Sequence, residues 1–182
     1  MKIYHLEADH AESERFFRES LIDYMNTAGQ AVPGSALSGE AKIGRGPHGK
    51  PYFLEPALQG VFFSRSHTKG HELLCFSENE IGIDCENLKT RAGIGERYTD
   101  IARRCFTDDE QIYIISGQGD GTLRFFEIWT AKEAYMKYTG KGFSEGFRTF
   151  SVLSAPDVRI ETGRLNGAPC VVYSVCTARK VM

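Results

Sequence analysis

The order of apolar and polar positions predicts a chain that mixes strands with helices. Short alternating or strongly apolar runs are typical of strands, and apolar residues that recur every three or four positions are typical of amphipathic helices. Strands are therefore expected at residues 2–6, 61–66, 72–77, 81–86, 147–153, 158–165 and 170–177. Helices are expected at residues 11–24, 107–115 and 123–138.

Turn and cap residues support these bounds. Thr107 precedes Glu110 by three positions, which is the spacing of an N-terminal capping box, and Gly140 follows the long helix as a C-terminal cap. Residues 29–49 are rich in glycine and proline and predict a long loop, a kind of segment that is often functional in a compact domain. The strands between residues 61 and 86 are expected to form an antiparallel meander.

Length and element order together predict the domain organisation. A chain of 182 residues suits one domain or two tightly packed halves. Strand and helix content falls on both sides of a seam expected near residues 87–92. We therefore predict an α+β fold in which an N-terminal half, residues 1–88, and a C-terminal half, residues 89–182, together form one domain.

Composition limits the partners. The 22 basic residues against 24 acidic ones give a net charge of −2, so no global field favours nucleic acid or an anionic membrane. The five cysteines show neither a CxxC pair nor zinc-site spacing, which indicates free thiols in a reducing compartment. No apolar run approaches the roughly 20 residues that span a bilayer. A soluble cytoplasmic protein that binds neither nucleic acid nor membrane is expected.

An acidic pair ends the strand predicted at residues 81–86. Asp84 and Glu86 are two residues apart, so an extended strand aims both carboxylates at one face. Neighbouring carboxylates repel and raise each other's pKa unless a cation neutralises them. A solvated strand end is the alternative. Oxygen-only ligation of this kind suits Mg²⁺.

A second candidate group lies on the long predicted helix. Trp129, Glu133 and Lys137 recur at four-residue intervals and share a face. An ordinary Glu–Lys helical pair is the alternative, but a helix that buries Trp129 would draw both charges inward, where an unpaired charge is costly. The two charges would then need a ligand or each other, and with a ligand Glu133 could meet Asp84 and Glu86 around one hard cation.

Basic and hydroxyl residues are candidates for binding phosphate. Ser66 and His67 offer hydroxyl and imidazole donors, with Arg65 and Thr68 beside them. A structural or exposed histidine is the alternative reading. Lys50 lies between Gly49 and Pro51, which is either a phosphate contact or merely a turn.

Taken in order, these motifs resemble those of the 4′-phosphopantetheinyl transferases over roughly residues 47–150. The resemblance is to the larger, surfactin-synthetase-activating type, because half a domain precedes the acidic pair. The matching segments are Gly49-Lys50-Pro51, Ser66-His67-Thr68, Gly82-Ile83-Asp84-Cys85-Glu86, Trp129-Thr130-Ala131-Lys132-Glu133-Ala134 with Lys137, and Gly140-Lys141-Gly142.

The resemblance implies a fold and a set of roles. The family fold has two similar α/β halves related by pseudo-twofold symmetry, with the active site in the cleft between them. Asp84, Glu86 and Glu133 match the ligands of Mg²⁺, which holds the pyrophosphate of coenzyme A. Glu133 also matches the general base, and Lys137 matches the lysine that stabilises or protonates the departing 3′,5′-ADP.

Further residues match contacts to coenzyme A, the co-substrate. Lys50, Ser66 and His67 correspond to residues that contact its phosphates. Candidates for its 3′-phosphate are Arg15, Arg18 and Arg45. The chain departs from the family at Cys85, where only a packing change is expected, and at Arg65, which replaces the usual aliphatic residue and whose role stays open.

The function implied is Mg²⁺-dependent transfer of 4′-phosphopantetheine to a serine of an apo acyl or peptidyl carrier protein. A metal-dependent hydrolase of nucleotides or phosphate esters is one alternative, and a non-catalytic module that binds coenzyme A or a carrier is another. The carrier could serve fatty-acid, polyketide or peptide synthesis. A monomer is expected, with the carrier docked near residues 103–121, where Phe106, Ile112 and Tyr113 lie.

Overall fold

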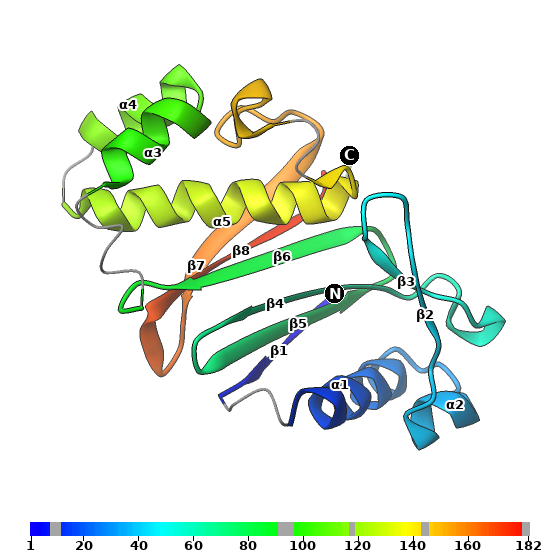
Figure 1. Ribbon diagram of the computed structural model, residues 1–182. Coiled ribbons are helices and arrows are strands. Elements are labelled where there is room, and N and C mark those ends of the chain that lie inside the picture. The colour runs from blue at the N-terminus through cyan, green and yellow to red at the C-terminus, as the bar shows by residue number, and fades with distance from the viewer. Residues whose placement is uncertain (8–11, 91–96, 117–118, 143–145, 180–182) are drawn as a thin grey trace.

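The computed structural model describes residues 1–7, 12–90, 97–116, 119–142 and 146–179 (Figure 1). It confirms a mixed α+β fold. Its elements, where η marks a 3-10 helix, are β1 (Lys2–Leu6), α1 (Ser13–Thr27), α2 (Gly34–Ser38), β2 (Ile43–Arg45), β3 (Pro51–Phe53), η2 (Pro56–Leu58), β4 (Phe62–Thr68), β5 (His71–Ser77), β6 (Ile81–Asn87), α3 (Tyr98–Cys105), α4 (Asp108–Ser116), α5 (Gly121–Thr139), η5 (Phe147–Thr149), β7 (Val158–Leu165) and β8 (Ala168–Ala178).

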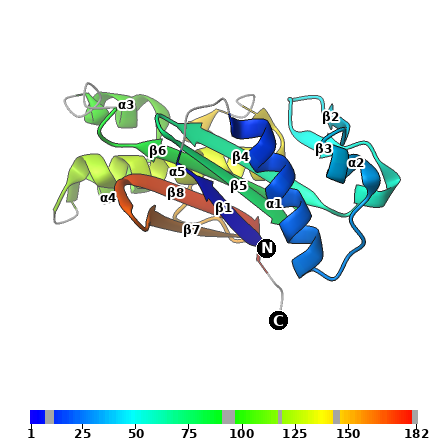
Figure 2. The same cartoon turned by 90° about the horizontal axis from the view of Figure 1, so that it is seen from below.

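The strands form two three-stranded antiparallel sheets and a separate hairpin. The first sheet has the order β1-β5-β4, the second has the order β6-β8-β7, and β2 pairs with β3. Helix α1 packs on the first sheet, as Figure 2 shows from below. Helix α5 runs along the second sheet (Figure 1). Each sheet is therefore covered by one long helix.

Alternation along the strands separates the cores. Leu74 and Phe76 of β5 join Phe17 and Leu21 of α1 in one apolar cluster. The intervening residues of β5, with Ile83 of β6, belong to a second cluster that joins the two sheets. Since successive side chains of a strand point to opposite faces, the even-numbered residues of β6 are left to face α5.

Gly82 brings α5 unusually close to β6. A Cβ atom at this position would lie 2.0 Å from the carbonyl oxygen of Ala134 and 2.5 Å from the amide nitrogen of Tyr138. Only glycine permits so close a backbone approach. Because Glu133 and Lys137 lie on this part of α5, Gly82 also sets their distance from the acidic residues of β6.

Strands β4 and β6 belong to different sheets but run side by side. The backbone N–H groups of Ile83, Cys85 and Asn87 donate to the hydroxyls of Ser64, Ser66 and Thr68 over 3.0, 3.2 and 3.0 Å. Each pair is separated by 19 residues, so the two strands run parallel. Side-chain hydroxyls here replace the carbonyl acceptors of an ordinary sheet.

A buried ion pair anchors α5 on its other side. Lys132 and Glu110 are both 0% exposed, and the Lys132 Nζ atom lies 2.9 Å from Glu110 Oε2. The ammonium also donates to the carbonyl oxygens of Phe147 and Phe150 over 2.6 and 2.5 Å. The backbone N–H of Val152 donates to Glu110 Oε1. This network explains why residues 147–153 do not form the predicted strand: η5 and bends lie there.

Most predicted elements are confirmed, and the errors concern both strand pairing and elements that the patterns missed or misassigned. The predicted meander is wrong for its third strand, because β6 pairs with β8 instead of β5. The predicted loop at residues 29–49 contains α2 and β2, and the sequence patterns missed α3. The sheets divide between β5 and β6. The boundary at residue 88 stays a prediction, and residues 91 and 92 of the expected seam at 87–92 lie outside the described part.

Two composition-based expectations can be compared with the structure. All five cysteines are free, and Cys85 packs into the core between the sheets, as expected of a packing change. In the described residues, none of the helices combines the length and apolar character needed to cross a membrane.

Candidate active site

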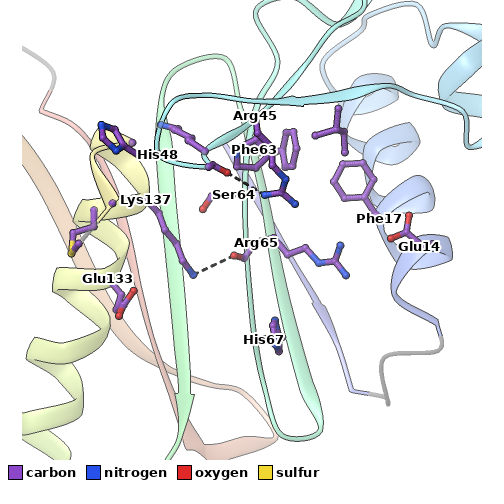
Figure 3. A pocket seen from close by; sticks show the side chains of 17 residues that line it. Glu14, Phe17, Arg45, His48, Phe63, Ser64, Arg65, His67, Glu133 and Lys137 are labelled. Carbon is purple, nitrogen blue, oxygen red and sulfur yellow. Dashed lines mark hydrogen bonds between the residues drawn. The ribbon is translucent and has the colours of Figure 1, made fainter. Parts of the chain in front are cut away.

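A cavity of about 590 Å³ opens between α5, β4, α1 and the hairpin of β2 and β3. Glu133 and Lys137 line it from α5, and Arg65 and His67 line it from β4 (Figure 3). Apolar side chains, among them Phe17, complete the wall on the side of α1. The cavity thus joins the predicted catalytic residues to a partly apolar recess.

Asp84 does not line the cavity itself but binds Lys137, which does. It is 7% exposed, and its Oδ1 atom accepts hydrogen bonds from Ser66 Oγ and from Lys137 Nζ, each over 2.8 Å. Lys137 also donates to the backbone carbonyl of Arg65 over 3.2 Å, as drawn in Figure 3. Two elements therefore hold this carboxylate in a single orientation.

Glu133 belongs to the same electrostatic site. Its pKa is raised from 4.5 to about 7, chiefly by burial and then by the charges of Asp84 and Glu86, while Lys137 lowers it. Glu86 is buried on β6, on the strand face that it shares with Asp84. The helix and the strand thus bring the predicted three carboxylates into electrostatic contact.

The metal assignment of these carboxylates stays a prediction. Among the described residues, no group of three or more His, Cys, Asp and Glu side chains is gathered closely enough to hold a metal ion. The ammonium of Lys137 neutralises Asp84 at a distance of 2.8 Å. The donor set itself fits a hard cation such as Mg²⁺, because all three donors are carboxylates and their mutual repulsion favours a cation.

Ser66 occupies a different place from the one expected of a phosphate contact. It is buried, and its hydroxyl accepts from the backbone N–H of Cys85 and donates to Asp84. Both hydrogen-bonding roles of the hydroxyl are thus filled within the protein. The geometry makes Ser66 a support for Asp84.

Of the other residues predicted to contact coenzyme A, Lys50 and Arg45 line the cavity, whereas Arg15 does not. Lys50 lines the cavity, but its Nζ binds the Glu80 carboxylate and donates to the Tyr138 carbonyl over 2.5 Å. Arg45 also lines the cavity, and its Nη1 donates to the Gly49 carbonyl over 3.1 Å. Arg15 pairs with Glu19 on the exposed surface of α1.

Two features of this site escaped the sequence patterns. Arg65, whose role was open, lines the cavity and contacts Glu72 and Ser13. The signal for Glu72 was a charged residue at the start of a strand that is otherwise strongly apolar.

One residue predicted to contact the carrier protein is corrected. Phe106 is fully buried against Trp129 and Phe147 and cannot meet a partner.

Comparison with known families decides how this site is classified. A family model described as the 4′-phosphopantetheinyl transferase superfamily matches residues 80–178, more than half of the chain. The chain belongs to this superfamily. The matched segment contains Asp84, Glu86, Glu133 and Lys137. The predicted 4′-phosphopantetheinyl transferase family is confirmed.

Curated 4′-phosphopantetheinyl transferases from Bacillus are similar to this chain. One from Bacillus subtilis is 33% identical over 128 residues, 69% of this chain and 53% of that protein. Another, psf-1 of Bacillus pumilus, is 32% identical over 130 residues, 70% of this chain and 52% of that protein. Sfp of Bacillus subtilis strain 168 is 32% identical over 106 residues, 58% of this chain and 44% of that protein. The chain spans about half the length of these relatives.

Proposed function

We propose that this protein is a Mg²⁺-dependent enzyme that transfers 4′-phosphopantetheine from coenzyme A to a serine of an apo acyl or peptidyl carrier protein. The observation that carries the proposal is that Glu133 and Lys137 line the cavity from α5, while Lys137 binds the carboxylate of Asp84 and the charge of Asp84 acts on Glu133. Membership of the 4′-phosphopantetheinyl transferase superfamily supports the same reaction.

In this proposal Asp84, Glu86 and Glu133 hold Mg²⁺. The bound cation would supply charge neutralisation for the pyrophosphate, which is the main requirement of phosphoryl transfer. Lys137 would then leave Asp84 and donate to the departing phosphate of 3′,5′-ADP. Its side chain is 31% exposed, so the ammonium is within reach of a ligand in the cavity.

Glu133 accepts the proton of the carrier serine in this mechanism. A general base works best when its pKa is close to the working pH, and the pKa of Glu133 is about 7 without a cation, raised chiefly by burial and then by the charge of Asp84. A cation would lower that pKa, so the placing of the carboxylate beside the serine contributes more than its basicity.

The remaining assignments concern coenzyme A and the overall plan. We propose that Lys50, His67 and Arg45 surround its phosphates, since all three line the cavity. The two sheets, each covered by one helix, would be the two pseudo-twofold halves of the family fold, with coenzyme A between them. We further propose that the enzyme works in the cytoplasm as a monomer.

Helix α4 offers a place for the carrier protein. Ile112 and Ile115 are 64% and 62% exposed, and Tyr113 lies beside them. Exposed apolar groups of this kind favour contact with another protein. The docking region is thus proposed for the outer face of α4, without Phe106.

One experiment tests the reaction. The protein is incubated with coenzyme A, Mg²⁺ and an apo carrier protein, and the mass of the carrier is followed. A gain of one phosphopantetheine supports the transferase. Nucleotide release with an unchanged carrier would instead indicate a hydrolase, and neither change would indicate a binding module.

A matched pair of variants tests the role of Glu133. Glu133→Gln should abolish transfer and leave the fold intact. Glu127→Gln on the same helix should retain transfer, because the Glu127 carboxylate accepts a hydrogen bond from Tyr113 on α4 and does not line the cavity. Near-normal turnover of Glu133→Gln would contradict the assigned base.

A further inference from the structure

Arg65 places a guanidinium in the recess of the cavity away from the acidic wall. It lies in the middle of β4, and its backbone carbonyl accepts from Lys137. Figure 3 shows its side chain leaving the strand toward α1, away from Lys137. The ammonium of Lys137 and the guanidinium of Arg65 therefore lie on opposite sides of β4, the first beside Asp84 and Glu133 and the second in the recess near α1 (Figure 3).

Buried groups hold the Arg65 guanidinium in place. Its Nε lies 2.5 Å from Oε1 of Glu72, a carboxylate whose side chain is 4% exposed. Its Nη2 contacts Ser13 Oγ and lies 3.4 Å from Glu72 Oε2, and Ser13 donates to the same carboxylate. The approach of Nε to Oε1 is an ion contact, because Oε1 accepts no aligned hydrogen bond in the described chain.

This anchoring leaves one edge of the guanidinium for a ligand. In the described part of the chain, the contacts of the guanidinium are made through Nε and Nη2, so the two N–H groups of Nη1 have no partner there. The Arg65 side chain is 33% exposed and lines the cavity. Arg45 and His67 also line the cavity, and Glu14 lines it from α1. The planar fork of a guanidinium suits phosphate oxygens.

Coenzyme A has two separate anionic groups, its pyrophosphate and a phosphomonoester on the ribose. Under the proposed function, on which this inference rests, the pyrophosphate occupies the acidic wall beside Lys137. The second phosphate then needs a cation elsewhere in the cavity. We infer that Arg65, oriented by Glu72 and Ser13, is a specificity-determining residue that binds the ribose phosphomonoester.

The test compares ligands that differ only in this phosphate. Binding of coenzyme A and of dephospho-coenzyme A, and of adenosine 3′,5′-bisphosphate and adenosine 5′-monophosphate, is measured by calorimetry. The variants are Arg65→Lys, which keeps the charge beside Glu72, and Arg65→Leu with Glu72→Leu, which removes the ion pair without stranding a buried charge. The control, Arg159→Leu with Glu161→Leu, removes an exposed pair on β7.

We expect the wild type and the control to prefer the ligands with the phosphomonoester by about 10- to 100-fold, the range of a charge-assisted contact. The double Arg65 variant should lose that preference, and Arg65→Lys should reduce it several-fold, while affinity for dephospho-coenzyme A stays unchanged. A preference that survives in both Arg65 variants would show a purely structural ion pair and overturn the inference. Failure of the wild type to bind coenzyme A at all would refute the proposed function, and the inference with it.

Discussion

The hydrogen bond from Ser66 to Asp84 leads to a prediction with a built-in control. Replacing Ser66 by alanine removes a 2.8 Å bond to a buried carboxylate and a 3.2 Å bond from the N–H of Cys85. Replacing Ser64 removes, within the described residues, only the 3.0 Å bond from the N–H of Ile83. The two variants therefore differ in the contact to Asp84.

The expected magnitudes follow from the partners. A hydrogen bond between neutral groups contributes about 1 kcal/mol and one to a charged group about 1.5–3 kcal/mol. Ser64→Ala should then lower the free energy of unfolding by about 1 kcal/mol and Ser66→Ala by about 2–4 kcal/mol. Residues that orient metal ligands typically change metal affinity by about 10- to 100-fold when they are removed, so the Mg²⁺ half-saturation of Ser66→Ala should rise by about that factor.

Urea denaturation measures the free energies of unfolding. Carrier transfer at varied Mg²⁺ and coenzyme A concentrations measures the Mg²⁺ half-saturation and the KM for coenzyme A. The same Mg²⁺ dependence in Ser66→Ala and Ser64→Ala would refute a role of Ser66 in supporting Asp84. An increase in the KM for coenzyme A alone in Ser66→Ala would refute it too, since that result would make Ser66 a direct phosphate contact.

Three more predictions concern α5. Gly82→Ala should destabilise the protein by about 1–3 kcal/mol through overpacking, because the added Cβ atom would meet the backbone of Ala134. Urea denaturation checks this. Gly34→Ala is the near-neutral control, since a Cβ atom added at Gly34 meets nothing within 4 Å. Lys132→Met should lower the free energy of unfolding by about 3–5 kcal/mol, since it strands the buried charge of Glu110; if a second change, Glu110→Gln, recovers none of the loss, the ion pair is not its cause. The raised pKa of Glu133 predicts that its contribution to the stability of the metal-free protein is present below its ordinary pKa of 4.5 and is lost as pH rises through about 7. Thermal unfolding from pH 5 to 8 should show this decline in the wild type and a smaller one in Glu133→Gln, and a larger decline in the variant would contradict the assignment.

The local sequence determined the elements and the identity of the chemical groups. The strand-like runs of β7 and β8, the capping box at Thr107 and the glycine after α5 are short-range signals, and each is realised where it was predicted. The spacing of Asp84 and Glu86, and of Glu133 and Lys137, likewise determined which side chains share a face. Such features depend on backbone geometry over a few residues.

Only the tertiary structure decided which groups meet. No local pattern shows that β6 leaves β5 to pair with β8, that the hydroxyls of β4 replace carbonyls beside β6, or that a buried lysine prevents a strand at residues 147–153. The contact of Ser66 with Asp84 and that of Arg65 with Ser13 depend on the same packing, because their partners are separated by 18 and by 52 positions in the sequence. Burial makes the contacts selective, since a buried polar group must find a partner wherever the chain brings one.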